Sequence, residues 1–142
     1  MDTRLAAPST ALRLGIGLTA TLAGLDKFFN LLADWSSYVS PAAAQLLPVA
    51  TTTFMGLVGI VEIAVGIAVL TRWTRLGAYA ASAWLLAIAG NLVLAGFYDV
   101  AVRDVVLSIA AFTLARMTDV EEGVLPAGAA ERGERLRRRV PA

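Results

Sequence analysis

Four long apolar stretches constrain the fold of this chain more than any other feature of its sequence. They lie at residues 11–32, 49–70, 76–97 and 100–117. A helix needs about 20 mostly apolar residues to cross the hydrocarbon core of a bilayer, and these stretches are near that length. Apolar residues make up 58% of the chain, whereas soluble domains average roughly 45–50%. The sequence therefore predicts an all-α fold of transmembrane helices.

The connecting segments indicate how these helices are arranged. Residues 71–75 and the turn at Tyr98 and Asp99 leave room only for a reversal of direction. We therefore expect a transmembrane antiparallel up-down four-helix bundle. The bundle is expected to occupy residues 1–117, and residues 118–142 are expected to form a polar, basic cytoplasmic tail.

The positive charges indicate the orientation of the bundle. Of the 12 Lys and Arg residues, ten lie towards the chain ends or in residues 71–75, whereas residues 34–48 contain none. Cytoplasmic segments of membrane proteins carry an excess of Lys and Arg. The sequence thus predicts a multi-pass protein of the plasma membrane with the N and C termini in the cytoplasm. Residues 34–48, with two aromatic side chains, are expected to lie at the outer surface.

The remaining polar residues fall on the inward face of each predicted helix and in the outer half of the bundle. They are Asp26, Lys27, Asn30, Glu62, Asn91, Asp99, Arg103 and Asp104. The residues expected to line the same site are Met55, Gly59, Gly66, Trp84 and Tyr98. Because an unpaired charge is costly in hydrocarbon, these groups should form ion pairs inside the membrane. Glu62 lies deepest, and we expect it to be protonated or to share a proton.

Structural roles compete with a ligand site at several of these positions, and both interpretations stay open at this stage. In the structural interpretation, Asp99 serves as a helix cap, Asp104 faces outer water, and the Lys27 side chain reaches the outer surface. Asn91 forms an interhelical hydrogen bond, and Gly59 and Gly66 serve close packing. Trp84 occupies a core or lipid-facing position. Glu62 and Arg103 are the hardest to explain by structure alone, because both are charged residues within apolar stretches.

The composition excludes several kinds of chemistry. The chain contains no Cys and no His, so it lacks a redox-active dithiol, a thiolate metal site and the commonest metal ligand. No glycine-rich phosphate loop and no metal-ligand spacing is present in the sequence. We expect no metal, no nucleic acid partner and no cofactor, with a quinone as the one alternative.

Several sequence segments resemble the DoxX-like family of four-span membrane proteins. They are GLDKFFN at residues 24–30 with Asp34 and Trp35, GLVGIVEIAVG at 56–66, RLGAY at 75–79 with Asn91 and Leu92, and YDVAVRD at 98–104. The resemblance covers nearly the whole chain before the tail. It implies a four-span bundle with a shared polar site at the matching positions.

Three hypotheses about function follow from the site and the resemblance. The first is an accessory or scaffold subunit of a membrane-associated redox or oxidative-stress system. The second is a quinone-linked oxidoreductase subunit of the thiosulfate:quinone type, with Lys27, Arg103 and Glu62 around the quinone. The third is a small-solute or proton-coupled carrier. The expected partners are the lipid bilayer, a membrane or soluble redox protein, and a second copy of the chain.

Overall fold

The structure, a computed structural model, describes residues 3–123 of the chain. Its long helices are α1 (Thr3–Asp26), α3 (Thr51–Leu70), α4 (Thr74–Ala95) and α5 (Tyr98–Glu121), and a short 3-10 helix η1 (Trp35–Tyr38) and helix α2 (Pro41–Leu46) join α1 to α3. No strand is present in the described residues. The predicted all-α fold is therefore confirmed. Most of the predicted basic tail, from residue 124 onward, lies outside this range.

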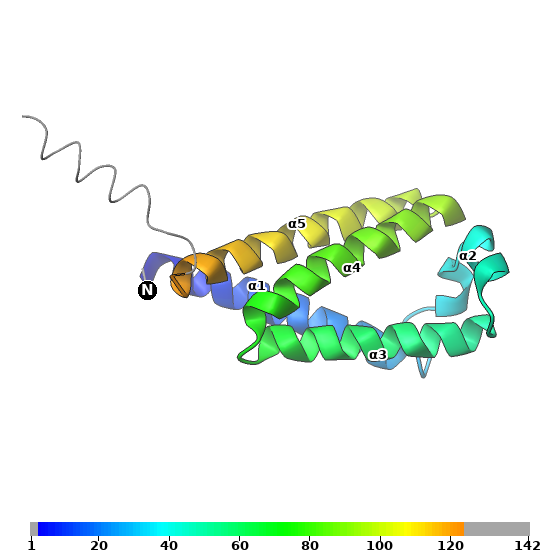
Figure 1. Cartoon of the computed structure of the whole chain (residues 1–142), viewed down its shortest axis with the longest axis horizontal. Helices are drawn as coiled ribbons and strands as arrows, with labels where there is room; N and C mark the ends of the chain where they lie inside the picture. Colours follow the sequence, from blue (N-terminus) through cyan, green and yellow to red (C-terminus); the bar gives the residue numbers. More distant parts are fainter. Residues whose placement is uncertain (1–2, 124–142) are drawn as a thin grey trace, which may run out of the picture.

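Two of the four long helices, α3 and α4, are long and apolar enough to cross a membrane. The other two contain more charged residues than α3 and α4 do, among them Arg13 in α1 and Arg103, Asp104 and Arg116 in α5. Successive long helices run in opposite directions, as Figure 1 shows.

The first helix ends earlier than the apolar stretch predicts. The stretch continues to residue 32, but α1 stops at Asp26. The carboxylate of Asp26 accepts hydrogen bonds from the backbone N–H groups of Leu31 and Leu32, each at 2.9 Å. These bonds fold the following residues back over the helix end, and Asn30 takes a positive φ of 51° within that turn. Local side-chain-to-backbone bonds of this kind compete with helix continuation.

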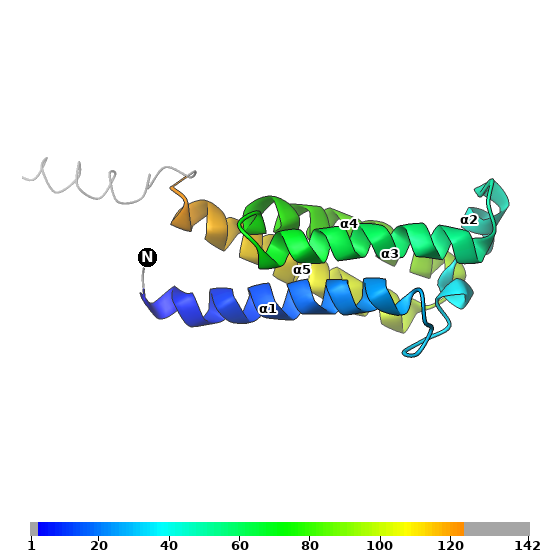
Figure 2. The same cartoon turned by 90° about the horizontal axis from the view of Figure 1, so that it is seen from below.

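The long helices form two pairs that meet at one end of the molecule. Helix α1 packs along α3 and α4 packs along α5. The start of α1, the α3–α4 turn and the end of α5 lie together at this end, whereas η1 and α2 lie at the opposite end, where the pairs diverge (Figures 1 and 2). Two glycines allow α1 and α3 to approach closely. A Cβ atom on Gly24 would lie 2.6 Å from the carbonyl oxygen of Gly59, and a Cβ on Gly59 would lie equally close to that of Gly24.

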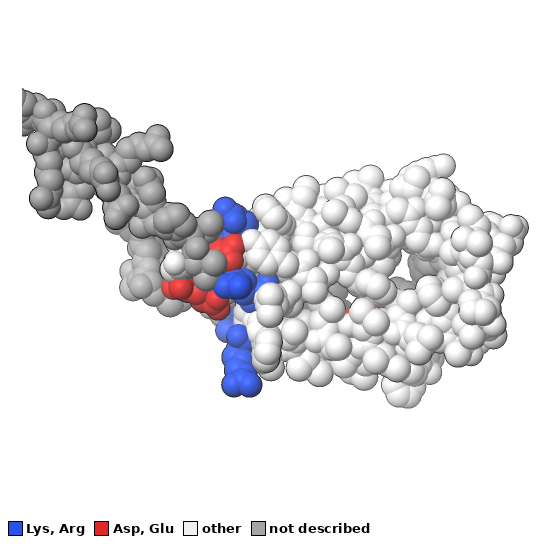
Figure 3. All heavy atoms as spheres, in the orientation of Figure 1, with Lys and Arg blue, Asp and Glu red and all other residues white. Residues whose placement is uncertain are grey.

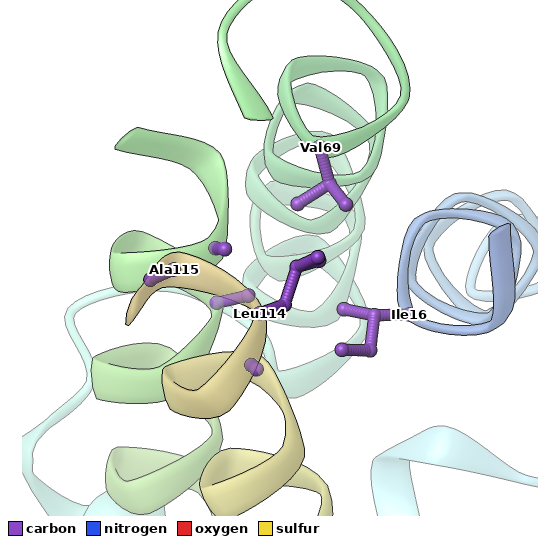
Figure 4. Packing of buried hydrophobic residues seen from close by; sticks show 7 residues of the cluster. Ile16, Val69, Leu114 and Ala115 are labelled. Atoms are coloured by element: carbon purple, nitrogen blue, oxygen red, sulfur yellow. The ribbon is translucent and has the colours of Figure 1, made fainter. Parts of the chain in front are cut away.

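The buried apolar cluster lies where the two pairs meet. It contains Ile16, Val69, Ala78, Ala81, Ala111, Leu114 and Ala115. Figure 4 shows Leu114 of α5 between Val69 of α3 and Ile16 of α1. The alanines of α4 and α5 let these helices pack closely, and one layer further along, the hydroxyl groups of Ser82 and Ser108 lie 3.0 Å apart.

An arginine also ties the two helices of the first pair together. The guanidinium of Arg13 donates hydrogen bonds to the carbonyl oxygens of Val69 at 3.1 Å, Leu70 at 2.6 Å and Thr71 at 2.7 Å. These carbonyls belong to the last turn of α3, where no further turn supplies an N–H donor. Arg13 of α1 thus supplies hydrogen-bond donors to the backbone carbonyl groups at the C-terminal end of α3.

Charged side chains gather at the end of the molecule where the helix pairs meet. Figure 3 shows acidic and basic atoms together there, while the rest of the visible face is almost entirely uncharged. The charged residues in the sequence segments at this end are Arg13, Arg72, Arg75, Arg116, Asp119, Glu121 and Glu122. Beyond them, large apolar side chains stand exposed on the helices, among them Leu18, Leu22, Leu57, Ile60, Val106 and Ile109.

Candidate functional site

A buried ion pair between α3 and the segment that follows α1 forms the centre of the candidate site. The ammonium Nζ of Lys27 lies 2.5 Å from the carboxylate Oε2 of Glu62, and only 4% and 9% of the two side chains are exposed. Lys27 comes directly after the end of α1, and Glu62 lies near the middle of α3. Gly24 and Gly59 bring these elements together, because a side chain at either position would hold the helices apart.

An aromatic residue covers the ion pair from the η1 segment. The Nζ atom of Lys27 lies 3.8 Å from the centre of the Trp35 ring, which is a cation–π distance. The indole N–H of Trp35 donates a 2.8 Å hydrogen bond to Oδ2 of Asp26. Asp26 therefore anchors the residue that covers Lys27. The sequence predicted Trp35 at the membrane surface and not in the site; its position nine residues after Asp26 was the available signal.

Two further side chains approach the ion pair from the second helix pair. Asp104 on α5 is half-buried and lies near Lys27 and Glu62. Trp84 on α4 lies beside Glu62, and the Glu62 carboxyl group is the acceptor that neighbours its buried indole N–H. The structure thus brings together Lys27, Glu62 and Asp104 of the predicted polar cluster and Trp84 of the predicted lining.

Asn91 is half-buried, and its side chain serves a different purpose from the ion pair. Its side-chain oxygen accepts a hydrogen bond from the backbone N–H of Ser40 at 3.0 Å, and its amide nitrogen donates to the carbonyl of Tyr38 at 2.7 Å. The Tyr38 ring stacks on Phe97, with 4.8 Å between ring centres. Asn91 therefore fixes the segment containing η1 and α2 to α4, and it makes no contact with the ion pair.

Four further predicted site residues do not join the cluster. Arg103 faces outward, and within residues 3–123 its one ion pair is with Asp99 at 3.9 Å, with 73% and 72% of their side chains exposed. Tyr98 is 65% exposed at the start of α5, and Asn30 is exposed in the turn after α1. Successive helix positions differ by about 100° in direction, so only one of Arg103 and Asp104 can face inward, and it is Asp104.

The predicted lining residues divide between the site and the helix seam. Met55 is buried on the same side of α3 as Glu62, two turns away. Gly59 and Gly66 instead lie against α1: a Cβ on Gly66 would lie 2.8 Å from the carbonyl oxygen of Gly17. These two glycines therefore serve close packing of α1 and α3 and do not form a wall of the site.

The surface between α3 and α4 is not fully closed. Figure 3 shows two openings there, and a few acidic atoms are visible beside the one nearer the middle of the molecule. The surrounding surface is uncharged on this face. The arrangement provides an ammonium group, two carboxyl groups and an indole N–H inside an apolar surround, which suits the recognition of a small polar group. Residues 3–123 contain no group of three acidic residues that could hold a metal ion.

Comparison with protein-family profiles, curated proteins and solved structures finds no match to this chain. The DoxX-like interpretation therefore depends on the sequence segments quoted above.

Proposed function

We propose that this chain is a four-span protein of the plasma membrane with both termini in the cytoplasm. We further propose that it is a DoxX-like accessory or scaffold subunit of a membrane-associated redox or oxidative-stress system. The observation that carries the membrane part of this proposal is the surface itself. Exposed leucine, isoleucine and valine side chains cover the helices, and charged groups gather at one end (Figure 3).

The charges within α1 and α5 are compatible with spanning the bilayer. Arg13 lies at the charged end, where it bonds the last carbonyls of α3. Lys27 is neutralised by Glu62 inside the bundle. Arg103 is exposed near the start of α5, within reach of lipid headgroups for a long side chain. Arg13, Lys27 and Arg103 are thus each bonded to a neighbour or lie near an end of a helix.

An accessory role agrees best with the side chains that the chain offers. Redox enzymes that act on thiols use cysteine, and this chain contains none. A contribution to a redox system would therefore pass through a partner or a bound molecule. The DoxX-like segments supply the link to such systems, and they include both residues of the buried ion pair, Lys27 and Glu62.

Cysteine labelling tests the topology directly, because the chain has no cysteine of its own. Gln45→Cys places a thiol in exposed α2, and Thr71→Cys places one in the exposed α3–α4 turn. In intact cells, a membrane-impermeant maleimide should label only the thiol at position 45, and both should react after permeabilisation. Labelling of both positions in intact cells, or recovery of the chain in the soluble fraction, contradicts the four-span proposal.

Purification from native membranes tests the accessory role. The chain carrying an affinity tag, expressed at its native level and extracted in a mild detergent, should bring a redox enzyme with it in fixed stoichiometry. An unrelated tagged membrane protein of similar size serves as the control for non-specific capture. Recovery of the chain alone, while other membrane complexes in the same extract remain intact, contradicts the accessory role and leaves the topology result unaffected.

A further inference from the structure

One segment connects the two helix pairs at the end where they diverge. Residues 31–50, which contain η1 and α2, are called the strap here. The strap joins α1 to α3, so both of its covalent ends belong to the first pair. It also contacts Asn91 of α4 and Phe97 in the turn between α4 and α5. The strap therefore links the first pair to the second at this end of the molecule (Figures 1 and 2).

The attachment of the strap to the first pair uses charged groups. The carboxylate of Asp26 accepts hydrogen bonds from the backbone N–H groups of Leu31 and Leu32 and from the indole N–H of Trp35. The Trp35 ring lies over the ammonium group of Lys27, with 3.8 Å between Nζ and the ring centre. Hydrogen bonds to an ionised group are roughly twice as strong as those between neutral groups. This attachment keeps Lys27 covered.

The attachment to the second pair uses neutral groups. The Asn91 side chain accepts a hydrogen bond from the Ser40 N–H at 3.0 Å and donates one to the Tyr38 carbonyl at 2.7 Å. The Tyr38 ring packs on Phe97. Among residues 3–123, no ion pair joins the strap to α4 or α5. The strap is therefore held less strongly on the second pair than on the first.

Each helix pair is tightly packed within itself, whereas the two pairs are firmly joined only at the opposite end. Gly24 and Gly59 bring α1 and α3 into close contact, and serine hydroxyl groups meet between α4 and α5. The buried apolar cluster around Val69 and Leu114 joins the pairs at what we call the packed end. Towards the strap, the surface between α3 and α4 is not fully closed (Figure 3). Two rigid units that share one packed end can pivot about that end.

We propose that the strap is a latch that controls a separation of the two helix pairs. When the contacts with Asn91 and Phe97 break, the strap stays on the first pair, and the second pair moves away about the packed end. This movement opens the buried Lys27–Glu62 pair to the outer side of the membrane. Only the side on which the pair opens depends on the proposed topology, and the latch is independent of the accessory role.

The single lysine of the chain makes this opening measurable. Lys27 is the one lysine in the sequence, so an amine reagent can modify only Lys27 and the N-terminal amino group. The purified full-length chain, with a lysine-free tag and in phosphatidylcholine nanodiscs, is treated with sulfosuccinimidyl acetate, and acetylation of Lys27 is followed by peptide mass spectrometry. Lys27 should react slowly in the unchanged chain, because it is buried. Asn91→Ala should speed the reaction by about tenfold, since it removes two hydrogen bonds that hold the latch closed.

Two variants separate the latch from other causes of exposure. Arg13→Met removes three hydrogen bonds at the packed end and should leave the acetylation rate unchanged. Trp35→Leu removes the ring over Lys27 but retains Asn91. It should therefore speed acetylation while the two helix pairs stay together.

Spin labels measure the separation of the pairs directly, because the chain has no cysteine of its own. Thr53→Cys near the start of α3 and Val102→Cys near the start of α5 place labels at exposed positions towards the strap. Ile67→Cys and Val120→Cys place them at exposed positions near the packed end. In double electron–electron resonance, Asn91→Ala should add a population of longer distances for the first two labels and leave the second two unchanged.

Four results overturn the proposal. They are unchanged distances between positions 53 and 102 in the Asn91→Ala chain, no faster acetylation of Lys27 in that chain, an equal acceleration by Arg13→Met, and longer distances between positions 53 and 102 in the Trp35→Leu chain. The measurements use the purified chain alone, so their failure is distinct from a failure of topology or of partner co-purification.

Discussion

Replacing Lys27 of the buried Lys27–Glu62 pair should lower the free energy of unfolding more than replacing Glu62, because Asp104 adds a second negative charge near the pair. Among residues 3–123, Lys27 supplies the one positive charge in contact with Glu62, so Lys27→Met leaves both Glu62 and Asp104 without a counter-charge from the described residues. Removing one partner of a buried pair costs about 3–5 kcal/mol, and the 4% and 9% exposure of the two side chains places this pair in that class. The Met side chain keeps most of the packing volume, so the loss comes mainly from charge.

Glu62→Gln should lower the free energy of unfolding by a smaller amount, about 1–3 kcal/mol. Lys27 then keeps the Trp35 ring at 3.8 Å and gains Asp104 as its main counter-charge. The Lys27→Met/Glu62→Gln double variant should lose clearly less than the sum of the two single losses, because it leaves no uncompensated partner of the pair.

Unfolding in mixed micelles of dodecyl maltoside and SDS, followed by far-ultraviolet circular dichroism, measures these differences. Arg103→Met is the matched control, since that side chain is 73% exposed and pairs only at 3.9 Å; it should change stability by less than about 0.5 kcal/mol. The reasoning is refuted if Glu62→Gln costs more than Lys27→Met, or if the two single losses simply add in the double variant.

Three further variants test other parts of the structure. Gly59→Ala should lower stability by about 1–3 kcal/mol in the same assay, because the new Cβ would lie 2.6 Å from the Gly24 carbonyl oxygen, whereas Gly90→Ala, with open space around its Cβ, should not. Arg13→Met should lose about 1–3 kcal/mol by removing three hydrogen bonds to the end of α3, and equal losses for exposed Arg72→Met would contradict this. Asn91→Ala should speed amide hydrogen exchange in the η1–α2 segment, including Ser40, whose N–H Asn91 holds; unchanged exchange there would show that the Tyr38–Phe97 contact suffices.

The helices could be predicted from the sequence because their cause is local. Apolar stretches of this length favour helix in any apolar surround, and the structure places a long helix on each of them. The predicted helix ends were less accurate than the predicted helices where a particular side chain determines the end. Gly96 closes α4 with a positive φ of 84°, a common helix terminator, but the end of α1 depends on Asp26 bonding N–H groups of residues 31 and 32. The apolar pattern of the sequence alone does not predict these hydrogen bonds.

The candidate site was predicted only in part, because adjacent residues on a helix point in different directions and the sequence does not say which of them faces inward. Lys27 and Glu62 lie on glycine-containing faces, so their meeting follows from the close approach of α1 and α3. On α5, by contrast, Arg103 and Asp104 are adjacent and differ by about 100° in direction. A charge count favours an inward arginine, because it would balance the carboxylates.

The packing of α5 is determined instead by its small inward residues, among them Ala101, Ser108 and Ala111, which are all buried. These positions place Asp104 half inward and Arg103 outward. The small residues that pack α5 against α4 therefore determine which of the two adjacent charged residues lies beside Glu62, and within residues 3–123 they leave Asp104 half-buried without an ion pair.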